Sequence, residues 1–230
     1  PYIRDTGVMI YESLKQGEKV LFEGAQGSLL DVDLGTYPYV TSSHPTSGGF
    51  TTGSGIGAGS IQDVLGITKA YTTRVGKGPF VTEEDNETGN KIRELGHEYG
   101  ATTGRPRRCG WFDAVVVKYS ARINGMTGLS LMLLDVLDGF DTIKLCYQYD
   151  FNGEKIEHFP ARLETVAECK PVYRELPGWK CDISGCRTYE ELPEAAKAYI
   201  RAIEEATGVP VQIVSVGPKR EQTIIREQIF

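Results

Sequence analysis

Hydrophobic positions recur at helical spacing in three segments of the chain. Residues 6–16 and 112–123 each carry an apolar stripe, and a glycine follows each segment where a helix would end. A third stripe predicts a helix over residues 188–207, with Thr188 as its cap, Glu191 three residues further on and another glycine at its end. The pattern therefore predicts amphipathic helices near both ends of the chain and in its middle.

Short apolar runs lie between these helices and predict buried strands. They cover residues 19–24, the first part of 66–80, 129–135 and 211–216, and the last is followed by Gly217-Pro218 and an expected helix start. Strands that alternate with helices indicate an α/β fold with a mainly parallel sheet flanked by helices. Ligands bind such sheets at the carboxyl ends of the strands. No convincing domain boundary interrupts the chain.

Three segments depart from this alternation. Residues 143–149 and 155–159 flank Asn152-Gly153 and predict an added β-hairpin. Residues 82–94 are polar and rich in glutamate, which predicts an exposed excursion. Residues 48–60 contain six glycines but match neither GxGxxG nor GxxxxGKS/T, so a mobile linker or lid and a phosphate cradle both stay open for this segment.

The composition is that of an ordinary globular protein. Of 230 residues, 40% are hydrophobic and 24% are charged, and no apolar run is long enough to span a bilayer. The net charge of −6 provides no overall positive field, so neither nucleic acid nor a membrane is an expected partner. Five cysteines without a CxxC pair or a secretory signal argue against a disulfide framework and structural zinc, and favour reduced thiols in a cytoplasm.

Positive charge is concentrated in the segment ATTGRPRRCGW, residues 101–111, which contains three arginines, Arg105, Arg107 and Arg108. Arginine forks bind carboxylates and phosphates in a bidentate manner, and the adjacent threonine hydroxyls and the predicted helix start favour an anion-binding loop. The alternative is that these arginines form solvated ion pairs with nearby glutamates such as Glu94 and Glu98.

Other polar side chains have weaker claims to a binding role. Asp135 ends a predicted strand, and its carboxylate could accept hydrogen bonds from N1–H and the exocyclic amine of guanine, although a helix cap or a surface turn would also explain it. Gln26, between two glycines, could bond the edge of a ligand, and the hydroxyl groups of Thr41, Ser42 and Ser43 could contact phosphate. The three histidines fit no Ser/His/Asp or metal pattern, so these residues indicate binding loops rather than a complete catalytic centre.

Several long motifs, in order along the chain, resemble the adenylosuccinate synthetase family. They are VLFEGAQGSLLDVDLGTYPYVTSSHPTSGG (residues 20–49), TTRVGKGPFVTE, GATTGRPRRCGW, LLDVLDG and SVGPKR. Several independent long motifs that occur in the family's order identify a family far more specifically than one glycine pattern does. The resemblance covers essentially all of the chain and about the carboxyl-terminal half of the family's length. It implies that residues 1–230 are the carboxyl-terminal portion of one synthetase domain, within a larger P-loop-NTPase-like fold.

The resemblance implies a ligase that joins L-aspartate to IMP with GTP as co-substrate and Mg²⁺ as cofactor. In the family's two-stage reaction, GTP phosphorylates the IMP oxygen and the aspartate amine then displaces that phosphate. The resemblance assigns Gln26 and Thr41 to IMP. Two arginines of the aspartate loop have a second role: Arg105 also contacts IMP, and Arg107 also reaches GTP. The implied aspartate loop is Ala101, Thr102, Thr103, Gly104, Arg105 and Arg107. The implied guanine pocket is Leu133, Leu134, Asp135, Ser215, Val216 and Gly217.

The resemblance also implies what this chain lacks. The family's phosphate loop, its catalytic aspartate and histidine and its magnesium ligands belong to the amino-terminal half, so we expect no catalytic or metal-binding residue here and an inactive isolated chain. A cytoplasmic homodimer is the family expectation. Many members carry lysine where this chain has Leu133. The leucine can still pack over the base, but it lacks the positive charge of lysine. Two alternatives stay open: a non-catalytic guanine-nucleotide module or scaffold, and a domain that binds another dicarboxylate.

Overall fold

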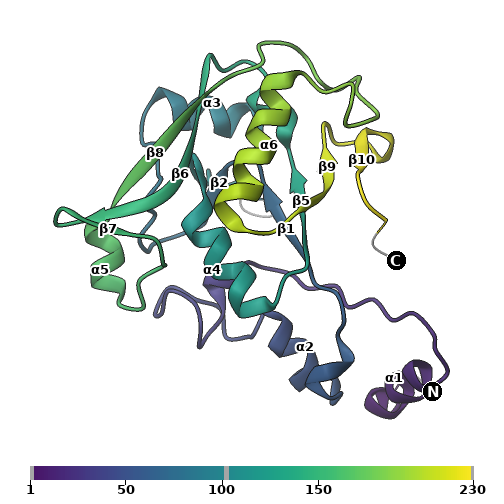
Figure 1. Cartoon of the computed structure of the whole chain (residues 1–230). Coiled ribbons are helices and arrows are strands. Elements are labelled where there is room, and N and C mark those ends of the chain that lie inside the picture. Colours follow the sequence, from purple (N-terminus) through teal and green to yellow (C-terminus); the bar gives the residue numbers. More distant parts are fainter. Residues whose placement is uncertain (1–2, 101–103, 229–230) are drawn as a thin grey trace.

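The structure is a computed structural model, and it describes residues 3–100 and 104–228. Its helices and strands alternate along much of the chain (Figure 1). The α-helices are α1 (Thr6–Lys15), α2 (Ser47–Ser54), α3 (Glu87–Leu95), α4 (Ala114–Asn124), α5 (Leu163–Glu168) and α6 (Glu194–Thr207). The strands are β1 (Leu65–Lys69), β2 (Thr72–Arg74), β3 (Arg108–Gly110), β4 (Phe112–Asp113), β5 (Gly128–Met132), β6 (Thr142–Phe151), β7 (Glu154–Ile156), β8 (Lys170–Pro177), β9 (Val211–Ser215) and β10 (Thr223–Ile225).

The central sheet has the strand order β1-β5-β9-β10. β1, β5 and β9 run parallel, and β10 adds an antiparallel edge. α6 crosses in front of this sheet in Figure 1 and contacts α4, β6 and β8. Buried side chains from β5 (Leu129 and Leu131) and α6 (Tyr199 and Ile203) belong to the same core cluster, which fixes the helix against the sheet. The expected α/β fold with a parallel sheet flanked by helices is confirmed.

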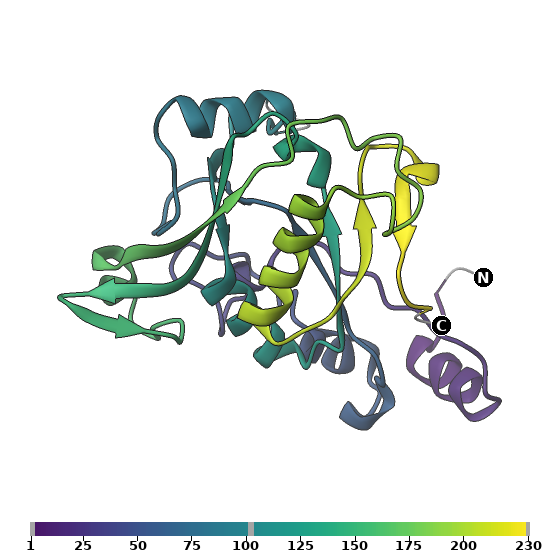
Figure 2. The same ribbon diagram turned by 45° about the horizontal axis from the view of Figure 1, so that its top comes forward.

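A second sheet carries the predicted hairpin. β6 pairs with β4 in parallel and with β7 and β8 in antiparallel fashion. Asn152 and Gly153 both have positive φ at the turn between β6 and β7, as a tight hairpin turn requires. This ribbon extends away from the carboxyl ends of the central strands in Figure 2. The hairpin prediction is therefore confirmed.

Two predicted helices are confirmed and one is too long. α1 and α4 agree with the expected segments to within a few residues. α6 starts only at Glu194, after Pro193, because the Glu191 carboxylate accepts hydrogen bonds from the backbone N–H groups of Arg187 and Thr188 and closes a turn that precedes the helix. The helix expected after Gly217-Pro218 is a single turn of 3₁₀-helix, Arg220–Gln222, followed by β10.

Two predicted strands differ from the structure. Residues 19–24 form no strand, and Leu21 is 75% exposed, because no neighbouring strand among the described residues offers backbone hydrogen bonds to this segment. The strand expected over residues 129–135 stops at Met132. Leu133 has a left-handed φ of 60°, and a 3₁₀-helix over Leu134–Leu137 follows.

The glycine-rich and glutamate-rich segments are both more ordered than their compositions indicate. Residues 48–54 belong to α2, which is held at its start because the Ser47 backbone N–H and hydroxyl group donate to Asn124 at 2.8 Å each. Most of this segment is therefore helical and not an irregular linker. The exposed excursion expected over residues 82–94 is confirmed only in part: residues 85–87, 90, 91 and 94 are exposed, but Thr82 and Ile92 are fully buried and α3 packs on β3.

Candidate functional site

The residues of the implied guanine pocket lie at the carboxyl ends of two central strands, β5 and β9. Because β1, β5 and β9 are parallel neighbours, their carboxyl ends lie side by side. Lys69 at the end of β1 pairs in register with Met132 at the end of β5, and the Ala70 N–H donates to the Met132 carbonyl at 2.8 Å. Asp135 follows β5 by one short turn, and Ser215 ends β9. Sheet geometry thus brings together residues that are 80 positions apart in sequence.

Asp135 is the most unusual group at this edge. One of its carboxylate oxygens, Oδ1, is buried and has no hydrogen-bond partner within the described residues. Burial raises the pKa of Asp135, and the nearby Asp182 carboxylate raises it further. A buried acceptor without a donor is unfavourable in an isolated chain, so such an atom marks a place where a ligand could supply the missing hydrogen bonds.

The remaining residues of the implied guanine pocket surround this turn. Leu134 and Val216 are fully buried, and Leu133 packs against the edge of the core cluster. The 3₁₀-turn with Asp135 contacts β9. The Ser215 hydroxyl donates to the Gly217 carbonyl at 2.9 Å, which holds the β9 turn in shape. The structure therefore places the six predicted residues on two adjacent turns.

The arginine segment forms a closed loop. Ala101, Thr102 and Thr103 lie outside the described residues. Gly104 has a φ of 62°, its N–H donates to the Gly100 carbonyl at 2.7 Å, and the Gly100 N–H donates to the Arg105 carbonyl at 2.9 Å. Tyr99 and Pro106 form an antiparallel bridge. Residues 98–100 and 104–107 are thus paired in antiparallel fashion, and Arg105 is exposed.

The other two arginines of this segment, Arg107 and Arg108, each pair with a different glutamate. The Arg107 Nη1 atom donates to the buried Glu98 carboxylate at 2.6 Å, so the ion pair with Glu98 that was the alternative explanation of the charge does exist. Arg108 lies in β3 and pairs with Glu83. β3 and β4 separate the loop from α4, so the expectation that the arginine loop leads directly into a helix is wrong; Asp113 caps that helix instead.

Gln26 and Thr41 also meet, although 15 residues separate them. The Gln26 Nε2 atom donates to Thr41 Oγ1 at 3.3 Å. The Ser43 hydroxyl completes the group, because it lies 3.1 Å from Gln26 Oε1 and 3.3 Å from Thr41 Oγ1. Gln26 has a positive φ of 73° and is exposed. The cluster presents amide and hydroxyl groups that can bond the edge of a ligand.

Sequence reasoning missed Arg74, which connects two of these regions. Its Nη2 atom donates to Thr36 Oγ1 at 2.7 Å, in the segment that leads to Thr41. Arg74 is also the register partner of Arg108 across β2 and β3. Burial lowers the pKa of Arg74, and the positive charge of Arg108 lowers it further. The only signal in the sequence was the position of this arginine inside the motif TTRVGKGPFVTE.

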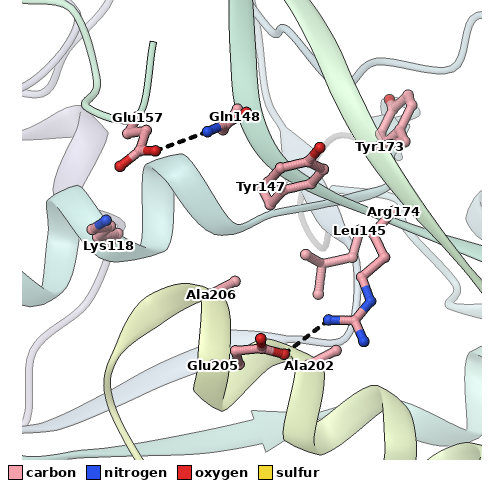
Figure 3. Close-up of a pocket in the computed structure, with 10 residues that line it drawn as sticks. All are labelled: Lys118, Leu145, Tyr147, Gln148, Glu157, Tyr173, Arg174, Ala202, Glu205 and Ala206. Atoms are coloured by element: carbon pink, nitrogen blue, oxygen red, sulfur yellow. Dashed lines mark hydrogen bonds and ion pairs between the residues drawn. The ribbon is translucent and has the colours of Figure 1, made fainter. Parts of the chain in front are cut away.

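A separate cavity lies on another face of the protein and contains none of the predicted site residues. It has a volume of about 450 Å³ and lies between α4, α6 and the β6–β8 ribbon (Figure 3). Arg174 points to Glu205 at 2.8 Å, and Gln148 pairs with Glu157 at 2.8 Å. In both pairs, the polar side chains at the cavity form hydrogen bonds with each other.

Metal chemistry finds no support in the part of the chain that the structure describes. No group of three or more His, Cys, Asp or Glu side chains there could hold a metal ion. The cysteines are free thiols, and burial raises the pKa of Cys109 to about 11. Within the same residues, no helix is long and apolar enough to cross a membrane.

Comparison with known proteins assigns the chain to a family. The sequence model of the family described as adenylosuccinate synthetase matches residues 1–224. The chain belongs to the adenylosuccinate synthetase family. It is 65% identical over 229 residues to the adenylosuccinate synthetase of Alkaliphilus metalliredigens and 64% identical to that of Clostridioides difficile. Each match covers 100% of this chain but 54% and 53% of the relative, so the chain spans about half the length of these relatives.

Solved structures agree with this assignment. A fully ligated adenylosuccinate synthetase from Plasmodium falciparum superposes with a TM-score of 0.94 at 45% identity, over 98% of this chain and 54% of that one. A succinoaminodeoxyadenylate synthetase of cyanophage S-2L, bound to dGMP and dATP, gives a TM-score of 0.58 at 18% identity, which indicates a shared fold alone. The expected membership of a larger synthetase fold is confirmed by the first match.

Proposed function

We propose that the protein to which this chain contributes joins L-aspartate to IMP at the expense of GTP and forms adenylosuccinate. The observation that carries the proposal is the buried Asp135 carboxylate oxygen, which has no partner among the residues that the structure describes and lies at the turn beside β9, in a chain of this family. A guanine base offers two neighbouring N–H donors that fit one carboxylate. This match between donors and acceptor supports a guanine nucleotide as the phosphoryl donor.

The other two clusters fit the two remaining substrates. The Gln26 and Thr41 cluster offers donors and acceptors to the polar edge of IMP. The loop of residues 101–107, with Arg105 and Arg107, would hold the carboxylates of aspartate, and Arg107 would also face GTP. In this proposal GTP transfers its γ-phosphoryl group to the IMP oxygen, and the aspartate amine then displaces phosphate. Such transfer depends mainly on positioning and charge stabilisation, which arginines supply.

Further parts of the proposal concern the whole protein. Residues 1–230 would be the carboxyl-terminal portion of one synthetase domain, and the groups that act as acid, base and Mg²⁺ ligands would lie outside them. Among the described residues, no group of three or more His, Cys, Asp or Glu side chains could hold Mg²⁺. A cytoplasmic homodimer active in purine nucleotide synthesis is part of the same proposal, and the isolated chain would be inactive.

A chimera tests the proposed reaction. This chain would replace the homologous half of the C. difficile synthetase, to which it is 64% identical. The chimera should convert IMP, GTP and aspartate to adenylosuccinate, measured by chromatography, and omission of any one substrate should abolish the product. A folded chimera that forms no adenylosuccinate would contradict the proposed reaction. Product formed by the isolated chain would contradict its predicted inactivity.

A further inference from the structure

Glu98 is a buried carboxylate at the base of the arginine loop. It is 1% exposed, and both of its oxygens are used. Oε1 accepts hydrogen bonds from Lys69 Nζ and from the Tyr71 hydroxyl group at 2.6 Å each, and Oε2 accepts one from Arg107 Nη1 at 2.6 Å. Burial alone would raise the pKa of Glu98, but these three hydrogen bonds lower it below its usual value. Glu98 is therefore a charged group, and both of its carboxylate oxygens accept hydrogen bonds.

The backbone fixes the same pair of residues. The Arg107 N–H donates to the Glu98 carbonyl at 2.9 Å, directly below the bridge between Tyr99 and Pro106. The Arg107 carbonyl in turn accepts from Arg93 Nε at 2.8 Å. Glu98 and Arg107 are thus joined through main chain and side chain, so the root of the Arg107 side chain and one edge of its guanidinium are held in a single geometry.

The partners of Glu98 connect the loop to the central sheet. Lys69 is the last residue of β1 and pairs in register with Met132, three positions before Asp135. Tyr71 lies two positions after Lys69 and is buried. A displacement of the Glu98 carboxylate would therefore move the arginine loop relative to the edge of the sheet that carries Asp135.

The charges of this group leave room for an anion. Lys69 and Arg107 carry two positive charges, and Glu98 carries one negative charge, so the group retains one excess positive charge. Glu98 occupies one Nη atom of a guanidinium that has five N–H donors. Within the described residues, Glu98 is the only side-chain partner of Arg107. The carboxylate thus anchors the arginine without neutralising the whole cluster.

We infer that Glu98 is a positioning residue, which orients the Arg107 guanidinium for anionic substrates without contacting them itself. The inference rests on the proposed function, since it assumes that Arg107 binds aspartate and faces GTP. It deepens that function, because it names Glu98 as the residue that sets the orientation of Arg107.

The test uses the chimera with Glu98→Gln, which keeps the shape of the side chain and removes its charge. The KM values for aspartate and GTP should each rise by about tenfold, which corresponds to the loss of one hydrogen bond between charged groups. The KM for IMP should rise less than either, because among the described residues Gln26 and Thr41 bond with each other and with Ser43, and not with Glu98. A loss of folded protein alone would lower the apparent kcat and leave all three KM values unchanged.

Two further variants separate position from charge. Glu98→Asp keeps the negative charge but withdraws the carboxylate by one methylene group, so the aspartate KM should rise by about threefold. Glu94→Gln is the matched control, because Glu94 is an exposed glutamate of α3, four positions before Glu98, and its carboxylate accepts a hydrogen bond from the Tyr99 hydroxyl group. Its KM values should stay within about twofold of the parent. On an Arg107→Ala background, Glu98→Gln should add little, because both changes remove the same interaction.

The outcomes distinguish this inference from the proposed function. An active chimera in which Glu98→Gln leaves the aspartate and GTP KM values unchanged overturns the positioning role alone. Equal rises in all three KM values also overturn it, because they indicate a general distortion. If Glu98→Gln does not fold, an unchanged aspartate KM in Glu98→Asp overturns it. A folded parent chimera without activity overturns the proposed reaction and, with it, the role assigned to Glu98.

Discussion

Arg74 donates a hydrogen bond from Nη2 to the hydroxyl oxygen of Thr36 at 2.7 Å, across 38 positions of the sequence. Its Nε atom also donates to the Lys77 carbonyl at 3.2 Å, so one guanidinium joins the β2 turn to the segment that ends at Thr41. Thr36 is 4% exposed, which places the contact in the interior. The proposed IMP cluster and the arginine loop are therefore mechanically linked through β2 and β3.

Loss of this link should affect IMP more than the other substrates. Arg74→Met keeps much of the length of the side chain and removes its donors. We expect the IMP KM of the chimera to rise by about five- to tenfold, less than the full loss of a hydrogen bond from a charged group would give, because Arg74 acts on the IMP cluster only through Thr36. Thr36→Val removes the acceptor instead and should act in the same direction. An IMP KM that stays constant in both variants would contradict the link.

Asp135→Asn should separate nucleotide recognition from stability. The substitution removes a charge that burial disfavours, so the melting temperature of the chain should not fall. The preference for GTP over ITP, which lacks the exocyclic amine, should decrease by about tenfold or more, because the hydrogen bond from that amine to a charged acceptor weakens. Steady-state kinetics of the chimera with both nucleotides measures the ratio, and an unchanged ratio would exclude Asp135 as the guanine acceptor.

Asp113 should make stability depend on pH. It is 2% exposed, caps α4 and accepts a hydrogen bond from the Tyr149 hydroxyl at 2.6 Å. Burial raises its pKa from 3.8 to about 6, against the opposing effect of that hydrogen bond. A raised carboxyl pKa favours folding when the group is protonated, so this contribution is largest below pH 3.8 and is lost as the pH rises through about 6.

Asp113→Asn tests this dependence, because asparagine still caps the helix. The free energy of unfolding of the variant, relative to the parent, should increase by about 2–3 kcal/mol between about pH 4 and about pH 8, as a shift of this size in the pKa requires. Urea unfolding at both pH values provides the measurement. Asp138, whose pKa burial also raises to about 6, stays unchanged in both proteins and cancels in the difference. A difference that does not vary with pH would refute a charged, buried Asp113.

Gly110→Ala should destabilise the fold beside the arginine loop. A Cβ atom on Gly110 would lie 1.9 Å from the Thr82 carbonyl oxygen, and that backbone cannot move without breaking the hydrogen bond from the Trp111 N–H. We expect a loss of about 3 kcal/mol in the free energy of unfolding. Gly185→Ala is the matched control, since a Cβ there meets no atom within 4 Å, and its effect should stay within about 0.5 kcal/mol. Similar changes in the free energy of unfolding for the two substitutions would show that the contact with Thr82 does not cause the loss of stability.

Periodicity predicted those elements whose structure depends on local sequence. α4 has a regular apolar stripe and a glycine in the left-handed conformation at its end, so its spacing alone was sufficient. The strand prediction for residues 19–24 was wrong because a strand forms only where a neighbouring strand shares backbone hydrogen bonds with it. The spacing of apolar residues carries no information about such a neighbour. α3 was missed because a glutamate-rich helix buries only one face, here at Ile92.

Candidate site residues were found where a motif or a chemical type marked them. Gln26 and Thr41 were named from the sequence, but their hydrogen bond depends on a backbone path that no local rule predicts. Glu98 was considered only as an ion-pair partner, since its burial and its bonds to Lys69 and Tyr71 arise from tertiary packing. Residues 101–103 stay a prediction, because they lie outside the described residues.

The hairpin turn at Asn152 and Gly153 offers a practical handle on these experiments. The β6–β7 ribbon extends away from the carboxyl edge of the central sheet, and both turn residues are exposed (Figure 2). An engineered cysteine at Asn152 could therefore carry a fluorescent probe far from the proposed substrate loops, once the exposed Cys181 is replaced by serine. Every variant described above could then be titrated with a single reporter whose own attachment leaves the binding loops intact.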